Sequence, residues 1–276
     1  MATVTNDDDL QRFDPDVLVV DDPSINAVRS WVRRARRVGV PVATIHDLGI
    51  AAIDSDLVID GSVHTPRGVK GHCGTLRGLP YMILDPGVRA MRQKLTRAVP
   101  RRILVVLGGG SRLTASARLV RMIAARMRDV EIRVAAGFSG GRRVPALAIG
   151  TWIHARDGLA KELASASVAV LAGGVTLYEA CALGVPSVAI ALNRAQHVTI
   201  RALARRGATV DAGVVTGDKA LTRVAREVER LVVDAAARRQ MAMAGRRLID
   251  ARGAARVAAR LRHLPAQVAG KIGYVA

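Results

Sequence analysis

The chain has 276 residues, half of them hydrophobic, and 42 Lys and Arg against 23 Asp and Glu give it a net charge of +19. The hydrophobic fraction excludes a chain that is disordered throughout, because disordered chains are poor in apolar residues. The positive charge predicts attraction to phosphate, nucleic acid or anionic lipid, without choosing among them.

Several classes of protein are disfavoured by composition. Aromatic residues make up only 3% of the chain, and proteins that bind single-stranded nucleic acid stack bases on aromatic side chains, so a nucleic-acid partner is not expected. Cys73 and Cys181 lie far apart and outside any CxxC pair, which argues against a disulfide framework or a metal site. The polar, acidic start, Met1 to Asp9, is unlike a signal peptide, so a cytoplasmic location is expected.

The first third of the chain shows strand–helix–strand alternation, which is typical of an α/β layer. Ser24 is a suitable N-cap for a helix ending near Arg37, and apolar runs predict strands at 17–20, 42–45 and 57–59. The segment 61–100 is rich in Gly and Pro and is predicted to be loop and linker. We therefore expect an incomplete α/β domain over residues 1–98.

A second α/β series opens at Ile103. Its apolar runs predict strands at 103–107, 132–135, 146–149, 168–171, 188–191 and 208–210, with helices between them and an Arg-rich helical region over 218–262. The apolar stretch 167–192 is long enough to span a membrane, but glycines and a proline break it into strand, helix and strand. We predict a complete Rossmann-like domain over residues 99–276.

Gly108, Gly109, Gly110 and Ser111 occupy a strand-to-helix turn. A helix N-terminus offers N–H groups and a positive dipole end, which suits a phosphate group. Leu113 stands where the dinucleotide fingerprint needs its third glycine, and no Walker A loop occurs, so NAD binding and P-loop hydrolysis are disfavoured. The alternative is a plain tight turn.

Residues 173–179 repeat this arrangement, with Gly173 and Gly174 before a helix that carries Thr176 and Glu179. A carboxylate in an apolar stretch is costly unless it has a partner. One interpretation is a capping box between Thr176 and Glu179. The other places Glu179 against the two hydroxyls of a ribose. The sequence leaves both open.

The segment 193–197 follows a predicted buried strand, and ligands of open α/β sheets bind beyond the carboxyl ends of strands. His197 suits either a general acid or base or a structural role.

With these segments in hand, the chain resembles the nucleotide-sugar proteins of the GT-B family, which include the peptidoglycan N-acetylglucosaminyltransferase. A closer similarity is to the UDP-sugar hydrolase of pseudaminic acid biosynthesis and its spore-coat polysaccharide relatives. The similarity covers most of residues 14–215 and is carried by Val17–Asp22, Gly78–Pro86, Gly108–Ser111, Gly173–Glu179 and Gln196.

The resemblance implies a GT-B-like α/β fold that binds a UDP-sugar, without a cofactor or metal, and hydrolyses or transfers it in surface polysaccharide or glycan biosynthesis. By this resemblance, Gly109, Gly110 and Ser111 lie near the uracil and phosphates. The amides after Gly173 and Gly174, with Thr176, hold the β-phosphate. Glu179 holds the ribose, and Gln196 faces the sugar.

The chain also departs from this family. Ala195 stands where members usually have Asn, with Asn193 two residues away as a substitute, and His46 stands where many have Asp. The His to which the family assigns catalysis has no counterpart, so the catalytic residue is unknown. The alternatives are a non-catalytic or split remnant of such an enzyme and a basic nucleic-acid binder. A homodimer or a partner chain would cover an open sheet edge, and the basic helices suit peripheral contact with the inner membrane face.

Overall fold

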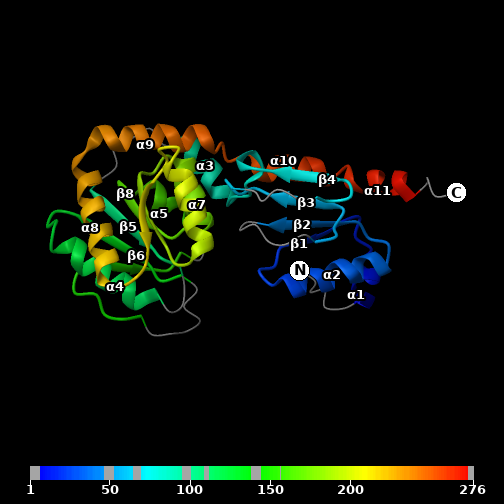
Figure 1. Cartoon of the computed structure of the whole chain (residues 1–276), viewed down its shortest axis with the longest axis horizontal. Coiled ribbons are helices and arrows are strands. Elements are labelled where there is room, and N and C mark those ends of the chain that lie inside the picture. The colour runs from blue at the N-terminus through cyan, green and yellow to red at the C-terminus, as the bar shows by residue number, and fades with distance from the viewer. Residues whose placement is uncertain are drawn as a thin grey trace. The chain divides into compact units, whose positions relative to one another are not determined.

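The computed structural model describes residues 7–46, 53–64, 70–94, 101–108, 112–137, 144–155 and 157–272. The chain divides into two compact units, residues 1–83 with 252–276 and residues 84–251 (Figure 1). Each unit is an α/β layer with its own parallel sheet, as the sequence predicts.

The first unit contains a four-stranded parallel sheet in the order β1-β2-β3-β4. Its elements are α1 (Asp7–Phe13), β1 (Leu18–Val20), α2 (Ile25–Arg37), β2 (Val42–His46), β3 (Leu57–Asp60), β4 (Gly74–Arg77), the 3₁₀ turn η1 (Leu79–Tyr81), α10 (Gly253–Leu261) and α11 (Leu264–Ile272).

Helices cover both faces of this sheet. On one face α2 buries Val28, Val32 and Ala35, whose spacing is that of a single helix face, against β1 and β2. On the other face Val257 and Leu264, from α10 and α11, pack against β2, β3 and β4. The predicted cap is confirmed, because the Ser24 hydroxyl accepts a hydrogen bond from the Ala27 N–H at 3.4 Å.

The prediction of loop and linker over 61–100 is wrong in part. This segment contains β4, which pairs with β3, followed by η1 and by a helix, α3 (Pro86–Lys94). The sequence signal for β4 is weak because the strand has four residues and only one of them, Leu76, is a buried apolar residue.

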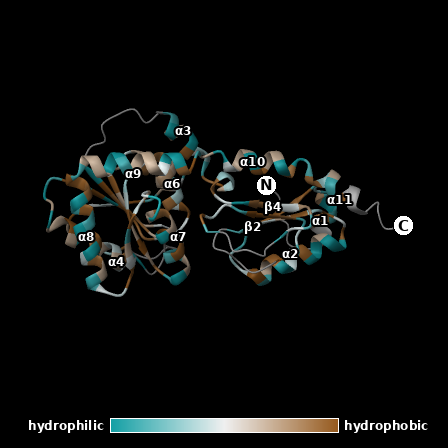
Figure 2. Ribbon diagram, turned by 45° about the horizontal axis from the view of Figure 1, so that its top comes forward, coloured by the Kyte–Doolittle hydropathy of each residue, from teal (hydrophilic) through white to brown (hydrophobic). Residues whose placement is uncertain are grey.

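The second unit contains a six-stranded parallel sheet whose central strands are strongly apolar (Figure 2). Its elements are α3, β5 (Arg102–Val106), α4 (Leu113–Ala124), β6 (Glu131–Ala135), β7 (Thr151–Ile153), α5 (Ala160–Ala164), β8 (Val168–Leu171), α6 (Val175–Leu183), β9 (Ser187–Ala191), α7 (Arg194–Ala204), β10 (Val210–Val214), α8 (Asp218–Val233) and α9 (Ala235–Leu248).

The strand order of this sheet is β10-β9-β8-β5-β6-β7. The chain therefore moves outward through β5, β6 and β7, then returns to place β8 beside β5 and moves outward on the other side. The helices α4 and α8 share a core with one face of the sheet, while α6 and α7 follow the strands on the return side. This is a doubly wound sheet with its switch point between β5 and β8.

One predicted strand is misplaced. The run Ala146–Ile149 is not a strand; β7 forms at Thr151–Ile153 instead. Trp152 explains the shift, because its ring packs against the main core and its indole N–H donates to the Pro145 carbonyl at 2.7 Å. Ile149, in contrast, is 53% exposed.

The last two helices, α10 and α11, belong to the first unit. The sequence analysis instead placed them in the second domain and set the domain boundary after residue 98. Within the first unit, Arg256 donates to the Pro80 carbonyl at 3.0 Å and Arg260 to the Cys73 carbonyl at 2.8 Å. A side chain at Gly253 would put its Cβ only 2.6 Å from the Met82 carbonyl carbon. Residues 84–94 belong to the second unit, where α3 packs on α5 and α6.

The close packing of Gly253 in α10 against the Met82 backbone can be tested. We expect Gly253→Ala to lower the free energy of unfolding by about 1–3 kcal/mol, because the added methyl group must displace the Met82 backbone. Chemical denaturation followed by circular dichroism measures the change. Ala254→Ser, at the exposed next position of α10, is the matched control. An unchanged midpoint for Gly253→Ala would contradict this close packing.

Candidate functional site

A cavity of about 370 Å³ lies beyond the carboxyl ends of the central strands of the second unit. Val106, Ala135 and His154 line it from the ends of β5, β6 and β7, and Thr176 and Glu179 line it from α6. The remaining lining residues are Gly137, Ala155, Gly158 and Leu159. The cavity therefore occupies the crevice beside the switch point, where open α/β sheets bind their ligands.

The cavity has an apolar side and a polar side. Val106, Ala135 and Leu159 supply aliphatic walls, whereas Thr176, Glu179 and His154 supply groups that can hydrogen-bond. Such a mixture suits a ligand with a flat apolar part and hydroxyl or phosphate groups.

Glu179 is the buried acidic group of the site. Its side chain is only 8% exposed, and α6 around it is buried from Leu177 to Leu183. Burial raises the pKa of Glu179, and the Asp85 carboxylate raises that pKa further; a hydrogen bond from the Asp85 main-chain N–H acts in the opposite direction. An ionised carboxylate here is costly and lines a cavity, which is the pattern of a functional group.

The capping-box interpretation of Glu179 is wrong. The N-cap of α6 is Gly174, with Thr176 already inside the helix, and no side chain of the described residues caps this end. Glu179 therefore does not bond back to the start of its own helix. Its carboxylate is left for the cavity and for Asp85.

Gly173 and Gly174 play different structural roles. A Cβ at Gly173 would lie 2.8 Å from the Gln196 carbonyl oxygen, so glycine is needed for the loop to pack against the start of α7. A Cβ at Gly174 would meet nothing within 4 Å, and the Gly174 backbone has an ordinary φ of −96°. Packing thus explains the first glycine, whereas the second leaves open space at the N-terminus of α6.

Asn193 and Gln196 hold the turn between β9 and α7. The Asn193 side chain accepts from the Gln196 N–H at 2.9 Å, and the Gln196 side chain accepts from the Leu192 N–H at 3.0 Å. Neither lines the cavity, although the contact between Gly173 and Gln196 brings this turn against the loop that precedes α6. His197 contacts Asp211 of β10, with 3.1 Å between Nε2 and the carboxylate.

The remaining candidates, Gly109, Gly110 and Ser111, lie outside the described residues. Among the polar residues that line the cavity, His154 was missed by sequence reasoning, because it follows a strand that was predicted several residues too early. Asp85, whose charge raises the pKa of Glu179 without lining the cavity, lies in the segment predicted to be a linker.

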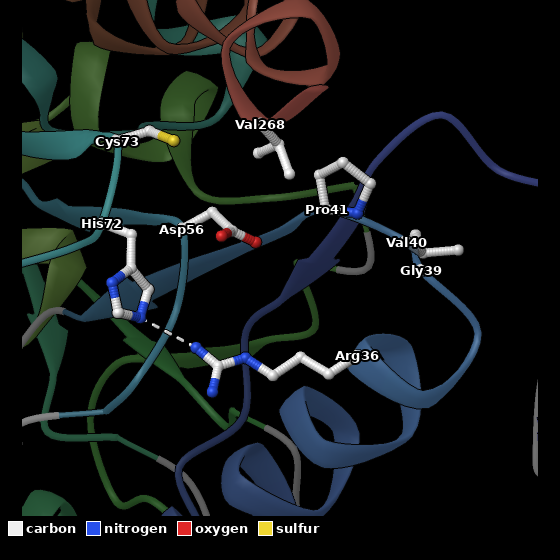
Figure 3. A pocket seen from close by; sticks show the side chains of 8 residues that line it. All are labelled: Arg36, Gly39, Val40, Pro41, Asp56, His72, Cys73 and Val268. Atoms are coloured by element: carbon white, nitrogen blue, oxygen red, sulfur yellow. Dashed lines mark hydrogen bonds between the residues drawn. The ribbon is translucent and has the colours of Figure 1, made fainter. Parts of the chain in front are cut away.

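A second cavity, of about 340 Å³, lies in the first unit at the amino ends of β2, β3 and β4 (Figure 3). Arg36 and His72 stand at its rim with 2.9 Å between their nitrogens, and both bond Asp54. The Arg36 hydrogen bond, opposed by burial and supported by His72, lowers the pKa of Asp54 to about 2. Arg36, His72 and Asp54 neutralise one another, and they lie at the amino ends of the strands, whereas open α/β sheets bind ligands at the carboxyl ends. We therefore take the cavity in the second unit as the candidate functional site.

Two curated proteins are similar to this chain. The spore coat polysaccharide biosynthesis protein SpsG of Bacillus subtilis is 28% identical over 227 residues, 76% of this chain and 65% of that protein. The second is the UDP-N-acetylglucosamine–N-acetylmuramyl-(pentapeptide) pyrophosphoryl-undecaprenol N-acetylglucosamine transferase of Sorangium cellulosum. It is 31% identical over 258 residues, which cover 83% of this chain and 61% of that protein. The chain thus spans less than two thirds of the length of either relative. No protein-family model matches it.

Solved structures settle the fold. The UDP-GlcNAc 2-epimerase of Neisseria meningitidis, solved with UDP-GlcNAc bound, superimposes with a TM-score of 0.67 at 12% identity, over 92% of this chain and 78% of that one. Other solved structures that match the chain include glycosyltransferases and epimerases. The chain has the GT-B fold. The resemblance to the spore-coat and peptidoglycan proteins is confirmed, and the pseudaminic acid hydrolase remains a comparison from sequence motifs.

No helix in the described part of the chain has both the length and the apolar character needed to cross a membrane. This agrees with the interpretation of residues 167–192 as two strands and a helix, β8, α6 and β9.

The two glycines before α6 give a matched test of the site's packing. Gly173→Ala should lower the free energy of unfolding by about 1–3 kcal/mol, because its Cβ would collide with the backbone of Gln196. Gly174→Ala should leave stability nearly unchanged, since its Cβ would meet open space. Equal losses of stability in denaturant titrations would contradict this division of roles.

The buried Glu179 carboxylate should lower the stability of the fold. A raised pKa means that the folded state binds more protons than the unfolded state, so stability falls as pH rises through the ordinary carboxyl range and the cost is complete above the folded pKa. Glu179→Gln removes this cost and should match or exceed the parent in melting temperature at pH 7. The difference should disappear near pH 4. A clear loss of stability at pH 7 would show instead that the carboxylate supports the fold.

Proposed function

We propose that this chain binds a UDP-activated sugar and hydrolyses or transfers it in the synthesis of a surface polysaccharide or glycan. The observation that carries the proposal is the buried Glu179 carboxylate in the cavity at the switch point of the second unit. The two curated relatives support it, since their names place them in spore-coat polysaccharide synthesis and in N-acetylglucosamine transfer from a UDP-sugar.

In this proposal, each part of the nucleotide has a chemical counterpart. The aliphatic wall of Val106, Ala135 and Leu159 takes the uracil ring. Glu179 accepts hydrogen bonds from the two ribose hydroxyls, which an ionised carboxylate does well because it has acceptors only. The diphosphate lies at the start of α6, by Gly174 and Thr176, where main-chain N–H groups and the helix dipole favour negative charge.

The sugar would lie beyond the diphosphate, on the side of the turn at Asn193 and Gln196. These side chains are hydrogen-bonded within the turn. Gly109, Gly110 and Ser111 are proposed to lie near the uracil and phosphates, as the resemblance implies. A catalytic residue is not assigned, because none of the described groups is placed against a reacting bond.

A second candidate is binding without turnover. It is favoured by one observation: all described residues that line the cavity belong to the second unit. UDP could therefore be held there while the reaction depends on groups that this unit does not supply. Incubation with UDP-GlcNAc and assay of released UDP separates the two, because a non-catalytic chain binds the nucleotide and releases none.

Two further expectations from sequence concern partners. β1 forms an edge of its sheet, with Val19 42% exposed, and a second copy or another chain is proposed to cover it. Peripheral contact with an anionic membrane through the basic helices also remains a proposal.

The nucleotide proposal is tested by calorimetric titration with UDP. We expect saturable binding at moderate salt, weakened about tenfold or more in Glu179→Ala, because the ribose hydroxyls lose their charged acceptor. Glu227→Gln, which removes an equal charge from an exposed pair with Arg230 on α8, is the matched control and should bind as the parent does.

Binding that Glu179→Ala does not affect, and that disappears as salt is raised, would instead report general attraction of an anion to a basic protein. That result would contradict the proposed site and would favour the nucleic-acid alternative.

A further inference from the structure

Arg92 on α3 joins the C-terminal ends of two other helices of the second unit, α6 and α9. Its guanidinium donates to the Ala182 carbonyl of α6, and to the Arg246 and Ile249 carbonyls at the end of α9 at 2.8 and 3.0 Å. Arg246 in turn donates to the Arg92 carbonyl at 3.2 Å. One side chain therefore connects three helices that are far apart in the sequence but lie together in the fold (Figure 2).

The end of α6 is completed by this contact. The last four carbonyls of a helix have no partner within the helix. The Ala180 carbonyl accepts from the Val185 N–H at 2.8 Å, beyond the end of α6, and the buried residue Ala182 has its carbonyl bonded by Arg92. A buried carbonyl without a partner is costly, and a positive charge is favourable at the C-terminal end of a helix dipole.

The end that Arg92 holds is close to the acidic group of the cavity. Glu179 precedes Ala182 on α6 by about one helical turn. This part of α6 also packs tightly on α9, since a Cβ at Gly245 would lie 2.7 Å from the Cys181 carbonyl oxygen. A change in the contact of Arg92 with α6 therefore acts on the helix segment that carries Glu179.

We propose that Arg92 is a positioning residue of the nucleotide site, which holds α6, and with it Thr176 and Glu179, in the conformation that receives the nucleotide. The inference rests on the proposed function, because it takes α6 as the helix that binds the ribose and the diphosphate. It adds a residue that is not among the described residues lining the cavity.

The length of α6 makes such support important. The helix has nine residues, Val175–Leu183, and isolated helices of this length are marginal in water, so their order depends on tertiary contacts. In the proposed complex the diphosphate bonds N–H groups at the start of α6, while Arg92 bonds a carbonyl at its end. A site that is ordered before the ligand arrives binds more tightly, because the ligand does not have to order it.

The decisive variant is Arg92→Lys. It keeps the positive charge, but an ammonium group lacks the planar fork of donors with which a guanidinium reaches several carbonyls. UDP affinity is measured by calorimetry for the parent, for Arg92→Lys and for the control Arg126→Lys, at a temperature where circular dichroism shows all three to be folded. Arg126 forms a surface pair with Glu229 at 2.7 Å, so the control makes the same change away from α6.

We expect Arg92→Lys to bind UDP about threefold to tenfold more weakly than the parent, because apparent affinity falls with the fraction of the protein that is competent to bind. Arg126→Lys should bind as the parent does. A contact that only stabilises the fold would lower the melting temperature and leave the affinity of the folded protein unchanged. Parent-like affinity in folded Arg92→Lys would overturn the proposal.

Chemical rescue gives a second readout. Arg92→Ala leaves the space of the guanidinium group, so free guanidinium ions, far below the concentration that unfolds proteins, should restore part of the lost UDP affinity. Sodium chloride at the same ionic strength should not restore it, since it only screens charge. Equal effects of the two salts would overturn the proposal.

A third measurement uses the parent protein alone. The guanidinium N–H signals of Arg92, assigned by through-bond NMR correlations, report its hydrogen bonds to the three carbonyls. They should shift when UDP saturates the protein, because Ala182 belongs to the helix that binds the ligand, whereas the Arg126 signals should stay in place. Unchanged Arg92 signals in the UDP-saturated protein would overturn the proposal.

The two proposals fail separately. Absence of UDP binding to the folded parent contradicts the proposed function. UDP binding that Glu179→Ala weakens but Arg92→Lys leaves unchanged contradicts only the role of Arg92.

Discussion

The order of strands in the second unit determines where chemistry can occur in this protein. β8 returns to lie beside β5, and every strand of the sheet is parallel to its neighbours. A parallel sheet is buried by helices on both faces, so its polar groups gather in the loops at the strand ends. The return of β8 opens a crevice between oppositely directed loops, and Glu179 and Thr176 reach it from α6.

The buried Glu179 carboxylate is unfavourable for the fold itself. The surrounding helix is apolar, and burial together with the Asp85 charge raises the pKa of Glu179. A structural role would be better served by a neutral side chain. In our proposal, the hydroxyl donors of a bound ligand offset this cost, which is why we assign Glu179 a binding role.

Most of the fold could be predicted from the sequence because its strands are continuous apolar runs and its turns contain glycine. β5, β8 and β9 were found for this reason, and the helix start at Ser24 was found from its capping chemistry. β4 and β7 were not predicted at their positions because they are short and mostly half-buried. Pairing with neighbouring strands, rather than a local sequence pattern, forms them.

Part of the candidate site, the cavity that contains Thr176 and Glu179, could be proposed from the sequence for the same reasons. Glu179 stood out as a charge in an apolar stretch, but the capping box with Thr176 could be excluded only by seeing Gly174 at the N-cap. The effect of Asp85 on the pKa of Glu179 could not be found, since the two positions lie 94 residues apart in the chain. The return of α10 to the first unit rests on the fit of Gly253 against Met82, which no periodic pattern signals.

The most direct test of this account is a crystal structure of the chain with UDP. The account predicts the uracil in the cavity of the second unit, the ribose hydroxyls within hydrogen-bond distance of the Glu179 carboxylate, and the diphosphate at the start of α6. UDP bound elsewhere, such as in the cavity beside Arg36 and His72 of the first unit, with Glu179 facing an empty crevice, would contradict it.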